Sequence, residues 1–297
     1  MLVVGALHHD VVVTADRMPE LDETLVGRAV DYLCGGKGGN QAVAAARHGA
    51  PTAMAGRVGG DAAGQTLLSN LKDAGVDCSC IVRAEDERSG MSVAIVTGAG
   101  DYGAVIVSAA NRAIDPEAIE LPASVEVVLL QNEIPESVNT AVAERAKGQG
   151  ARVVLNAAPA RPFETGLRSA VDILILNRGE AAAMTGRAVD SVGDAVDVAT
   201  SLSVDGHDVI FTLGAEGAVL APAEGEAEHF PAFDADVLST HGAGDAFVGA
   251  LAARLALGND LRDALRYAQA VAALHVSCSA EARRSITAEM ALRLAEI

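Results

Sequence analysis

The amino-acid sequence predicts a layered α/β protein: a central, mostly parallel β-sheet lies between helices and carries a small second β-sheet. Half of the 297 residues are hydrophobic but only 3% are aromatic, so the core is built mainly from Ala, Val, Leu and Ile. Short apolar runs, too continuous to alternate with polar residues, are separated by Ala-rich stretches with helical spacing. Strands of that kind are typical of a parallel sheet that is buried on both faces.

The predicted strands of the central sheet are five apolar runs, at residues 2–4, 125–130, 152–155, 171–176 and 209–213. The predicted helices are Ala-rich or apolar stretches with helical spacing, at residues 41–48, 64–74, 137–148, 181–185 and 248–257. The tail from Thr287 also has helical spacing. This alternation predicts three layers, α/β/α, with helices on both faces of the sheet.

Two segments without a convincing helix interrupt this alternation, residues 10–34 and 89–109. The second predicts a β-hairpin, because the strand-like runs 91–97 and 104–108 flank a Gly-rich turn. We expect the two segments to form one small sheet that projects from the main domain as a lid. No linker or repeat divides the chain, so residues 1–297 are expected to form a single domain.

Charge and composition exclude several classes of function. The chain has 40 acidic and 22 basic residues, and its net charge of −18 argues against a nucleic-acid partner. It shows no basic amphipathic stretch, no apolar run long enough to span a bilayer and no signal peptide. The four cysteines, at positions 34, 78, 80 and 278, form neither a disulfide nor a zinc pattern. We therefore expect a cytoplasmic protein with no membrane partner.

Residues 35–40, Gly-Gly-Lys-Gly-Gly-Asn, directly precede the first predicted helix. Glycines let backbone amides approach a ligand closely, and a helix N-terminus adds the positive end of a dipole. Lys37 can bind an anion or a hydroxyl, and Asn40 offers both a donor and an acceptor. The segment is not a phosphate-binding P-loop, since Gly follows Lys37 where Ser or Thr is required. A Gly-rich turn without a ligand is the alternative.

A second Gly-rich turn, Gly242-Ala243-Gly244, precedes Asp245 and an apolar helical run. Free amides at such a helix start form an anion-binding nest, and Asp245 places a carboxylate beside it. Phosphoryl transfer to an alcohol requires this combination, because the amides neutralise charge on the phosphoryl group and the carboxylate accepts the hydroxyl proton. The alternative is that Asp245 is only an acidic residue at a helix N-terminus.

Polar residues also follow other predicted strands, where they would face the ligand crevice of a parallel sheet. Asn177 and Glu180 follow the strand 171–176, and Glu180 could hold a water molecule on Mg²⁺. An N-capped helix start is the alternative there. The Gly-flanked turn 212–217 could contact nucleotide phosphates or ribose, or could be a hairpin turn.

The first strand is followed by Leu7-His8-His9-Asp10. An acid at Asp10 could hold substrate hydroxyls. A zinc site is disfavoured, because the adjacent side chains of His8 and His9 point to opposite faces of a strand.

Taken together and in this order, these segments resemble the ribokinase-like (PfkB) family of carbohydrate kinases, and are most similar to its ribokinase branch. The resemblance runs from the first strand to about Val276. Its most specific motifs are residues 35–42, Gly-Gly-Lys-Gly-Gly-Asn-Gln-Ala, and residues 242–245, Gly-Ala-Gly-Asp. The resemblance implies a β-lid over a sugar, and a homodimer in which the lids of two subunits pair.

The resemblance also implies a role for each matching residue. Asp245 would be the general base, and the amides of Gly242, Ala243 and Gly244 would form an anion hole. The sugar site would be lined by His8, Asp10, Gly36, Lys37, Asn40 and Glu133. ATP would face Asn177, Thr212, Gly214, Glu216 and Gly217. Glu180 would help to place Mg²⁺ through water.

The sequence departs from the family at three places. His8 stands where ribokinases carry Asn, and its imidazole is bulkier and titrates near neutrality, so the hydroxyls recognised there could differ from those of ribose. Ser239 replaces an Asp that helps to build a monovalent-cation loop in the family. The matching tail loop, usually Gly-rich, reads Ser-Ala-Glu-Ala-Arg-Arg at residues 279–284. A K⁺ site is therefore an open question, with Arg283 or Arg284 as a substitute for the cation.

The leading interpretation is a kinase that uses ATP and Mg²⁺ to phosphorylate a primary hydroxyl of a small sugar, such as the pentose ribose. A nucleoside kinase of the same fold is the first alternative, although the lid offers only Tyr32 and Tyr102 for stacking on a base. A sugar-phosphate kinase is disfavoured, because it needs further basic residues in the sugar site and Lys37 has few obvious companions. A non-catalytic sugar sensor is the other alternative, motivated by the altered cation loop.

Overall fold

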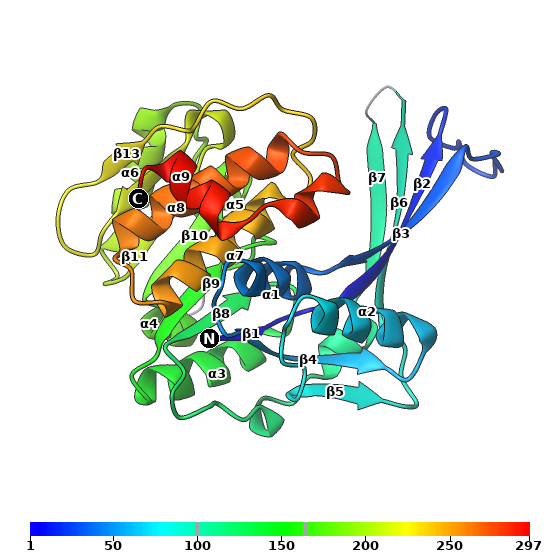
Figure 1. Ribbon diagram of the computed structural model, residues 1–297, viewed down its shortest axis with the longest axis horizontal. Helices are drawn as coiled ribbons and strands as arrows, with labels where there is room; N and C mark the ends of the chain where they lie inside the picture. The colour runs from blue at the N-terminus through cyan, green and yellow to red at the C-terminus, as the bar shows by residue number, and fades with distance from the viewer. Residues whose placement is uncertain (99–100, 163–164) are drawn as a thin grey trace.

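The computed structural model describes residues 1–98, 101–162 and 165–297, and these residues form two β-sheets (Figure 1). The larger sheet has nine strands in the order β13-β12-β11-β10-β9-β8-β1-β4-β5. These strands are β1 (Leu2–Val4), β4 (Ala53–Gly59), β5 (Ile81–Ala84), β8 (Val127–Gln131), β9 (Arg152–Asn156), β10 (Ile173–Asn177), β11 (Asp208–Thr212), β12 (Ala218–Ala221) and β13 (Glu228–Phe230). Only β12 runs antiparallel to its neighbours β11 and β13. The prediction of a mostly parallel sheet is confirmed.

Helices cover both faces of this sheet, because the apolar β-strand side chains alternate between two buried layers. The first layer packs against α3 (Glu136–Gly148), α4 (Thr165–Ala170), α5 (Arg178–Thr185) and α6 (Val192–Ser203). The second packs against α1 (Lys37–Arg47), α2 (Ala62–Asp73), α7 (Ala243–Ala256), α8 (Leu261–Val276) and α9 (Ala288–Ala295). None of the helices in these described ranges is long and apolar enough to cross a membrane.

The smaller sheet projects away from the helical layers in Figure 1, and we call it the lid. Its strand order is β3-β2-β6-β7. The strands are β2 (His8–Ala15), β3 (Ala29–Gly35), β6 (Gly90–Thr97) and β7 (Tyr102–Val107). The predicted hairpin is formed by the antiparallel pair β6 and β7, although residues 99–100 of its turn lie outside the described residues.

The two faces of the lid differ in chemistry. Asp10 and Ser92 are directly opposite each other on β2 and β6, and the Ser92 hydroxyl donates to Asp10 Oδ1 at 2.5 Å. Residues that are partners on neighbouring strands lie on the same face of a sheet, and successive residues of a strand alternate between the two faces. The register therefore places a group of exposed apolar side chains together on the face opposite to Asp10 and Ser92. These are Val30, Tyr32, Met91, Val93, Val105 and Val107. An exposed apolar patch of this kind is typical of an interaction surface.

Helices α1 and α7 touch through their backbones. A Cβ atom on Gly249 would lie 2.5 Å from the carbonyl oxygen of Gln41 and 2.6 Å from the Cβ of Ala44. Only glycine fits so close an approach, and the contact brings the first turns of the two helices next to each other.

A buried histidine makes stability depend on pH. His48 lies at the end of α1, and its Nδ1 atom is 2.7 Å from the hydroxyl of the buried Tyr267. Burial, together with the charges of Arg47 and Arg254, lowers the pKa of His48 from 6.5 to about 4.

The unfolded chain binds a proton on His48 below pH 6.5, whereas the folded chain does so only near pH 4. The free energy of unfolding therefore decreases as the pH falls from 6.5 towards 4, because protonation of His48 favours the unfolded chain. Between pH 7 and pH 5 this decrease in the free energy of unfolding is about 2 kcal/mol. We expect urea unfolding of His48→Gln to show a correspondingly weaker pH dependence than the wild type. Equal slopes for the two proteins would contradict the assignment.

Candidate active site

The Gly-rich segment 35–40 forms the first turn of α1 rather than a turn ahead of it. Helix α1 begins at Lys37, so the predicted start at residue 41 is too late by one turn. The N-cap Gly36 has a φ of 85°, and a Cβ atom there would lie 2.6 Å from the carbonyl oxygen of Ala6. Glycine alone meets both conditions. The start of α1 is thereby packed directly against the segment that follows β1.

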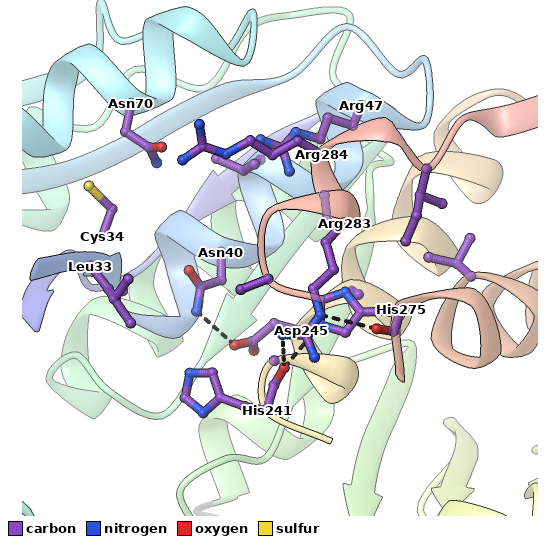
Figure 2. Close-up of a pocket in the computed structure, with 18 of the residues that line it drawn as sticks. Leu33, Cys34, Asn40, Arg47, Asn70, His241, Asp245, His275, Arg283 and Arg284 are labelled. Atoms are coloured by element: carbon purple, nitrogen blue, oxygen red, sulfur yellow. Dashed lines mark hydrogen bonds between the residues drawn. The ribbon is translucent and has the colours of Figure 1, made fainter. Parts of the chain in front are cut away.

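Asp245 lies in the first turn of α7, as predicted. Its two carboxylate oxygens accept hydrogen bonds from successive residues of α1: Asn40 Nδ2 is 3.0 Å from Oδ2, and Gln41 Nε2 is 3.0 Å from Oδ1 (Figure 2 draws the first). The buried Gln41 Nε2 also lies 3.0 Å from Asn156 Oδ1 at the end of β9. The orientation of the carboxylate is therefore fixed by the core.

The turn before Asp245 offers backbone donors. Gly242 is the N-cap of α7, with a φ of 76°. The amide of Ala243 donates to the carbonyl oxygen of Thr240 at 3.2 Å. The amides of Gly244 and Asp245 lie in the first turn, where a helix provides no acceptor. The turn can therefore bind an anion through backbone N–H groups and the helix dipole.

This turn separates two cavities. The first cavity, of about 270 Å³, lies between the lid and α1, and its lining includes Asp10, Asn40, Gly242 and Asp245. The second cavity, of about 450 Å³, is more apolar. Its lining includes Thr212, Gly214, Gly217, Phe233, Ala243, Gly244 and Phe247. Of the predicted ATP residues, Asn177 and Glu216 do not line it.

Three predicted sugar-site residues form a cluster of their own, and none of them lines the first cavity. The Lys37 amide donates to Glu133 Oε2 at 2.7 Å, and His8 Nδ1 lies 3.9 Å from the same oxygen. Burial raises the pKa of Glu133, opposed by His8 and Lys37, and the charge of Asp245 raises it further. The other ring nitrogen of His8, Nε2, is buried without a hydrogen-bond partner among the described residues.

Asn177 and Glu180 form an N-terminal capping box on α5, which is the alternative that the sequence left open. Asn177 Oδ1 accepts from the Glu180 amide at 3.0 Å, and Glu180 Oε2 accepts from the Asn177 amide at 2.7 Å. Burial raises the pKa of Glu180, and the charges of Lys37 and Asp245 act on it in opposite directions. Glu180 therefore lies within electrostatic reach of the Asp245 site. The carboxylate of Glu216 is bound by Arg178.

Arg283 holds the turn that leads into α7. Its guanidinium donates to three backbone carbonyl oxygens: those of Ser239 at 2.9 Å, His241 at 3.0 Å and His275 at 3.0 Å (Figure 2). His275 Nε2 also lies 2.9 Å from the carbonyl oxygen of His241. A permanent positive charge thus lies among the carbonyl groups just ahead of the anion-binding turn.

Sequence reasoning gave no role to Gln41 or Asn156. Gln41 lies within the Gly-rich motif, but a glutamine in a helix is an ordinary helix former. Its contact with Asp245 depends on the approach of α1 and α7, which no local pattern reveals.

Comparison with known proteins identifies the family. The family model for pfkB family carbohydrate kinases matches residues 1–287. The ribokinase of Bacillus subtilis (strain 168) is 36% identical over 281 residues, which cover 93% of this chain and 92% of the ribokinase. The chain belongs to the PfkB family of carbohydrate kinases. It is therefore a phosphotransferase with an alcohol group as acceptor.

Other relatives of this PfkB kinase agree on the fold but not on a single sugar. The structure of Arabidopsis thaliana ribokinase complexed with ribose and ATP matches with a TM-score of 0.91 at 29% identity, covering 100% of this chain and 98% of that one. The deoxyribokinase of Salmonella typhi is 32% identical over 282 residues, 93% of this chain and 92% of its own. The relatives thus leave the exact substrate of the PfkB kinase open.

Proposed function

We propose that this kinase transfers the γ-phosphoryl group of ATP to a primary hydroxyl of a small sugar, with ribose as the first candidate. The observation that carries the proposal is the junction of the two cavities. Gly242 and Asp245 line the first cavity, whereas Ala243 and Gly244 line the second. A sugar in the first cavity and a nucleotide in the second would meet at the anion-binding turn. The ribose and ATP bound by the Arabidopsis ribokinase support this arrangement.

In the proposed reaction Asp245 acts as general base. The sugar hydroxyl oxygen forms a bond to the γ-phosphorus, the bond from that phosphorus to the bridging oxygen of ATP breaks, and ADP leaves. The hydroxyl proton passes to the Asp245 carboxylate, whose geometry is held by Asn40 and Gln41. The amides of Gly242 and Gly244 would stabilise the charge on the transferred group, and the Ala243 amide would join them on leaving the carbonyl oxygen of Thr240.

The sugar would be held by groups on both sides of Asp245. Asp10 and Asn40 line the first cavity. The cluster of His8, Lys37 and Glu133 would complete the site. Gly36 would contribute by allowing the backbone conformation with positive φ at the start of α1. The free Nε2 of His8 supports its assignment as a ligand for a sugar hydroxyl. The chain as a whole would act as one domain, with segments 10–34 and 89–109 closing over the sugar.

The nucleotide would bind in the second cavity. Thr212, Gly214 and Gly217 line it, while Asn177 and Glu216 would contact ATP from outside that lining. Glu180 suits Mg²⁺ held through water, because it is a half-buried carboxylate with only one oxygen used in its capping box. Mg²⁺ neutralises charge on the phosphates when it is bound. We expect the reaction in the cytoplasm, where ATP is available.

We further propose that Arg283 replaces a monovalent cation. Its guanidinium already occupies the carbonyl oxygens that an ion would need, so the residues present do not fit K⁺. Wild-type turnover is expected to be equal in K⁺, Na⁺ and choline chloride. Arg283→Ala should lose about tenfold or more in kcat through disorder of the turn, with partial rescue by K⁺ or guanidinium ions. Strict K⁺ activation of the wild type would contradict this proposal.

The lid supports a homodimer. We expect its apolar outer face to pair with the same face of a second copy, because symmetric dimers use self-complementary patches. Val93→Asp should shift the protein towards monomer in analytical ultracentrifugation. Val204→Asp changes an exposed valine at the end of α6 and is the matched control. A monomeric wild type, or a Val93→Asp variant that dimerises as well as the control, would overturn the lid interface.

The proposed function is tested by ADP production with MgATP across a panel of pentoses, hexoses, polyols and nucleosides. One strong pentose substrate would support the proposal. A preference for nucleosides would replace it with a nucleoside kinase. Sugars that raise the melting temperature without any ADP production would indicate a sugar sensor.

A further inference from the structure

The first cavity extends beyond the proposed sugar site to a rim that carries two arginines. Arg47 in the last turn of α1 and Arg284 in the tail loop both line it, as does Asn70 of α2. Figure 2 shows the two guanidinium groups alongside each other near Asn70. Three elements far apart in the sequence thus bring two cations and an amide to the cavity that holds Asp245.

Neither guanidinium has a counter-ion or a hydrogen-bond acceptor in the part of the chain that the structure describes. Within that part, eight other arginines pair with a carboxylate. The two carboxylates of the first cavity do not serve the arginines, since Asp10 accepts from Ser92 and Asp245 from α1. Both residues are exposed, and other arginines of the described ranges also lack a carboxylate, but Arg47 and Arg284 lie together in the lining of one cavity, where an anionic ligand can contact both.

The two positive charges affect each other. Burial, and then the charge of Arg284, lower the pKa of Arg47 below its usual value. A helix C-terminus favours a cation such as Arg47, but its guanidinium extends along the cavity and makes no hydrogen bond to the last carbonyl groups of α1 among the described residues (Figure 2). An anion between the two guanidinium groups would remove their repulsion.

We propose that Arg47 and Arg284 form an anion subsite of the sugar cavity, so that the preferred sugar carries a phosphate or carboxylate at the end remote from the accepting hydroxyl. This inference rests on the proposed function. Guanidinium groups bind both kinds of anion through charge-assisted hydrogen bonds, and the Asn70 amide adds a neutral donor.

The spacing along α1 suits such a substrate. Arg47 lies two turns beyond Asn40, roughly 10 Å along the helix axis, and helical side chains lean back towards the N-terminus. A sugar with one anionic substituent can span that interval. Its hydroxyl would react as described above, with the proton going to Asp245 and ADP leaving, while the remote anion stays unchanged.

The experiment compares two matched pairs of acceptors with MgATP: D-ribose with ribose 1-phosphate, and the open-chain pair D-glucitol with D-gluconate. We expect the anionic member of one pair to have a kcat/KM about thirtyfold above that of its neutral partner. Arg47→Gln and Arg284→Gln should each reduce this ratio about tenfold. Arg293→Gln removes an exposed charge from α9, outside both cavities, and should leave the ratio unchanged.

The outcomes separate the proposals. Preference for ribose 1-phosphate identifies a phosphate subsite, and preference for gluconate a carboxylate subsite. Equal kcat/KM within both pairs, or a ratio that neither arginine variant changes, would overturn the subsite and leave the sugar kinase intact. If no acceptor is turned over, the proposed function fails, and calorimetry with ribose 1-phosphate then tests the subsite. Binding to the wild type that is lost in the Arg47→Gln/Arg284→Gln double variant supports the subsite. No binding to the wild type, or equal binding to both proteins, overturns the subsite.

Discussion

Asp245→Asn is expected to lower kcat about a thousandfold, because it removes the group that accepts the sugar proton. The amide has nearly the same shape as the carboxylate, so the melting temperature and the affinity for ATP should change little. The measurement is steady-state ADP production on the best acceptor from the substrate panel, with nucleotide binding followed by calorimetry.

Asp263→Asn is the matched control. Asp263 is the third residue of α8, as Asp245 is of α7, and it lies on the surface outside both cavities. If Asp245 were only a favourable acid at a helix N-terminus, both variants would lose a little stability and retain activity. Near-normal turnover by Asp245→Asn would therefore refute its role as base.

Asn40→Asp is expected to lower kcat/KM about a hundredfold at pH 7 and to move the pH–rate profile to higher pH. Asn40 Nδ2 donates to Asp245 Oδ2 at 3.0 Å, and the change places a second carboxylate at that contact. Two carboxylates so close share a proton over a wide pH range, and the shared proton blocks the base. The measurement is kcat/KM across pH 5 to 10.

Asn40→Ala separates the added charge from the lost hydrogen bond. This variant loses the contact without gaining a carboxylate, so its rate should fall while its pH profile moves to higher pH by clearly less than that of Asn40→Asp. Identical profiles for the Asp and Ala variants would show that repulsion between carboxylates plays no part.

Much of the site could be predicted because it depends on local chemistry. Glycines at 36 and 242 mark backbone conformations with positive φ, and each stands at the start of a helix. Asp245 follows the second of these turns directly, so the nest and its carboxylate were visible in four consecutive residues. Five strands of the central sheet, β1, β8, β9, β10 and β11, were visible for a similar reason, since burial on both faces leaves continuous apolar runs. The strands β4, β5, β12 and β13, which lie towards the two edges of the sheet, were not predicted.

The remaining features depend on contacts between distant segments. Gln41 is an unremarkable helical residue until α7 brings Asp245 against it. The three carbonyl oxygens bound by Arg283 come from two separate segments, so the sequence suggested a substitute cation but not how it would be held. The start of α1 was placed too late because glycines are poor helix formers, a preference that packing against the end of β1 overrides.

Gly249 makes the position of the Asp245 carboxylate depend on helix packing in the hydrophobic core. It lies one turn after Asp245 on α7 and leaves room for the α1 backbone at Gln41. Any larger residue there would push the two helices apart and lengthen both amide contacts to the carboxylate. Inherited or engineered loss of activity in this enzyme need not involve a residue that touches sugar or nucleotide, and a folded but inactive variant should direct attention to this helix pair.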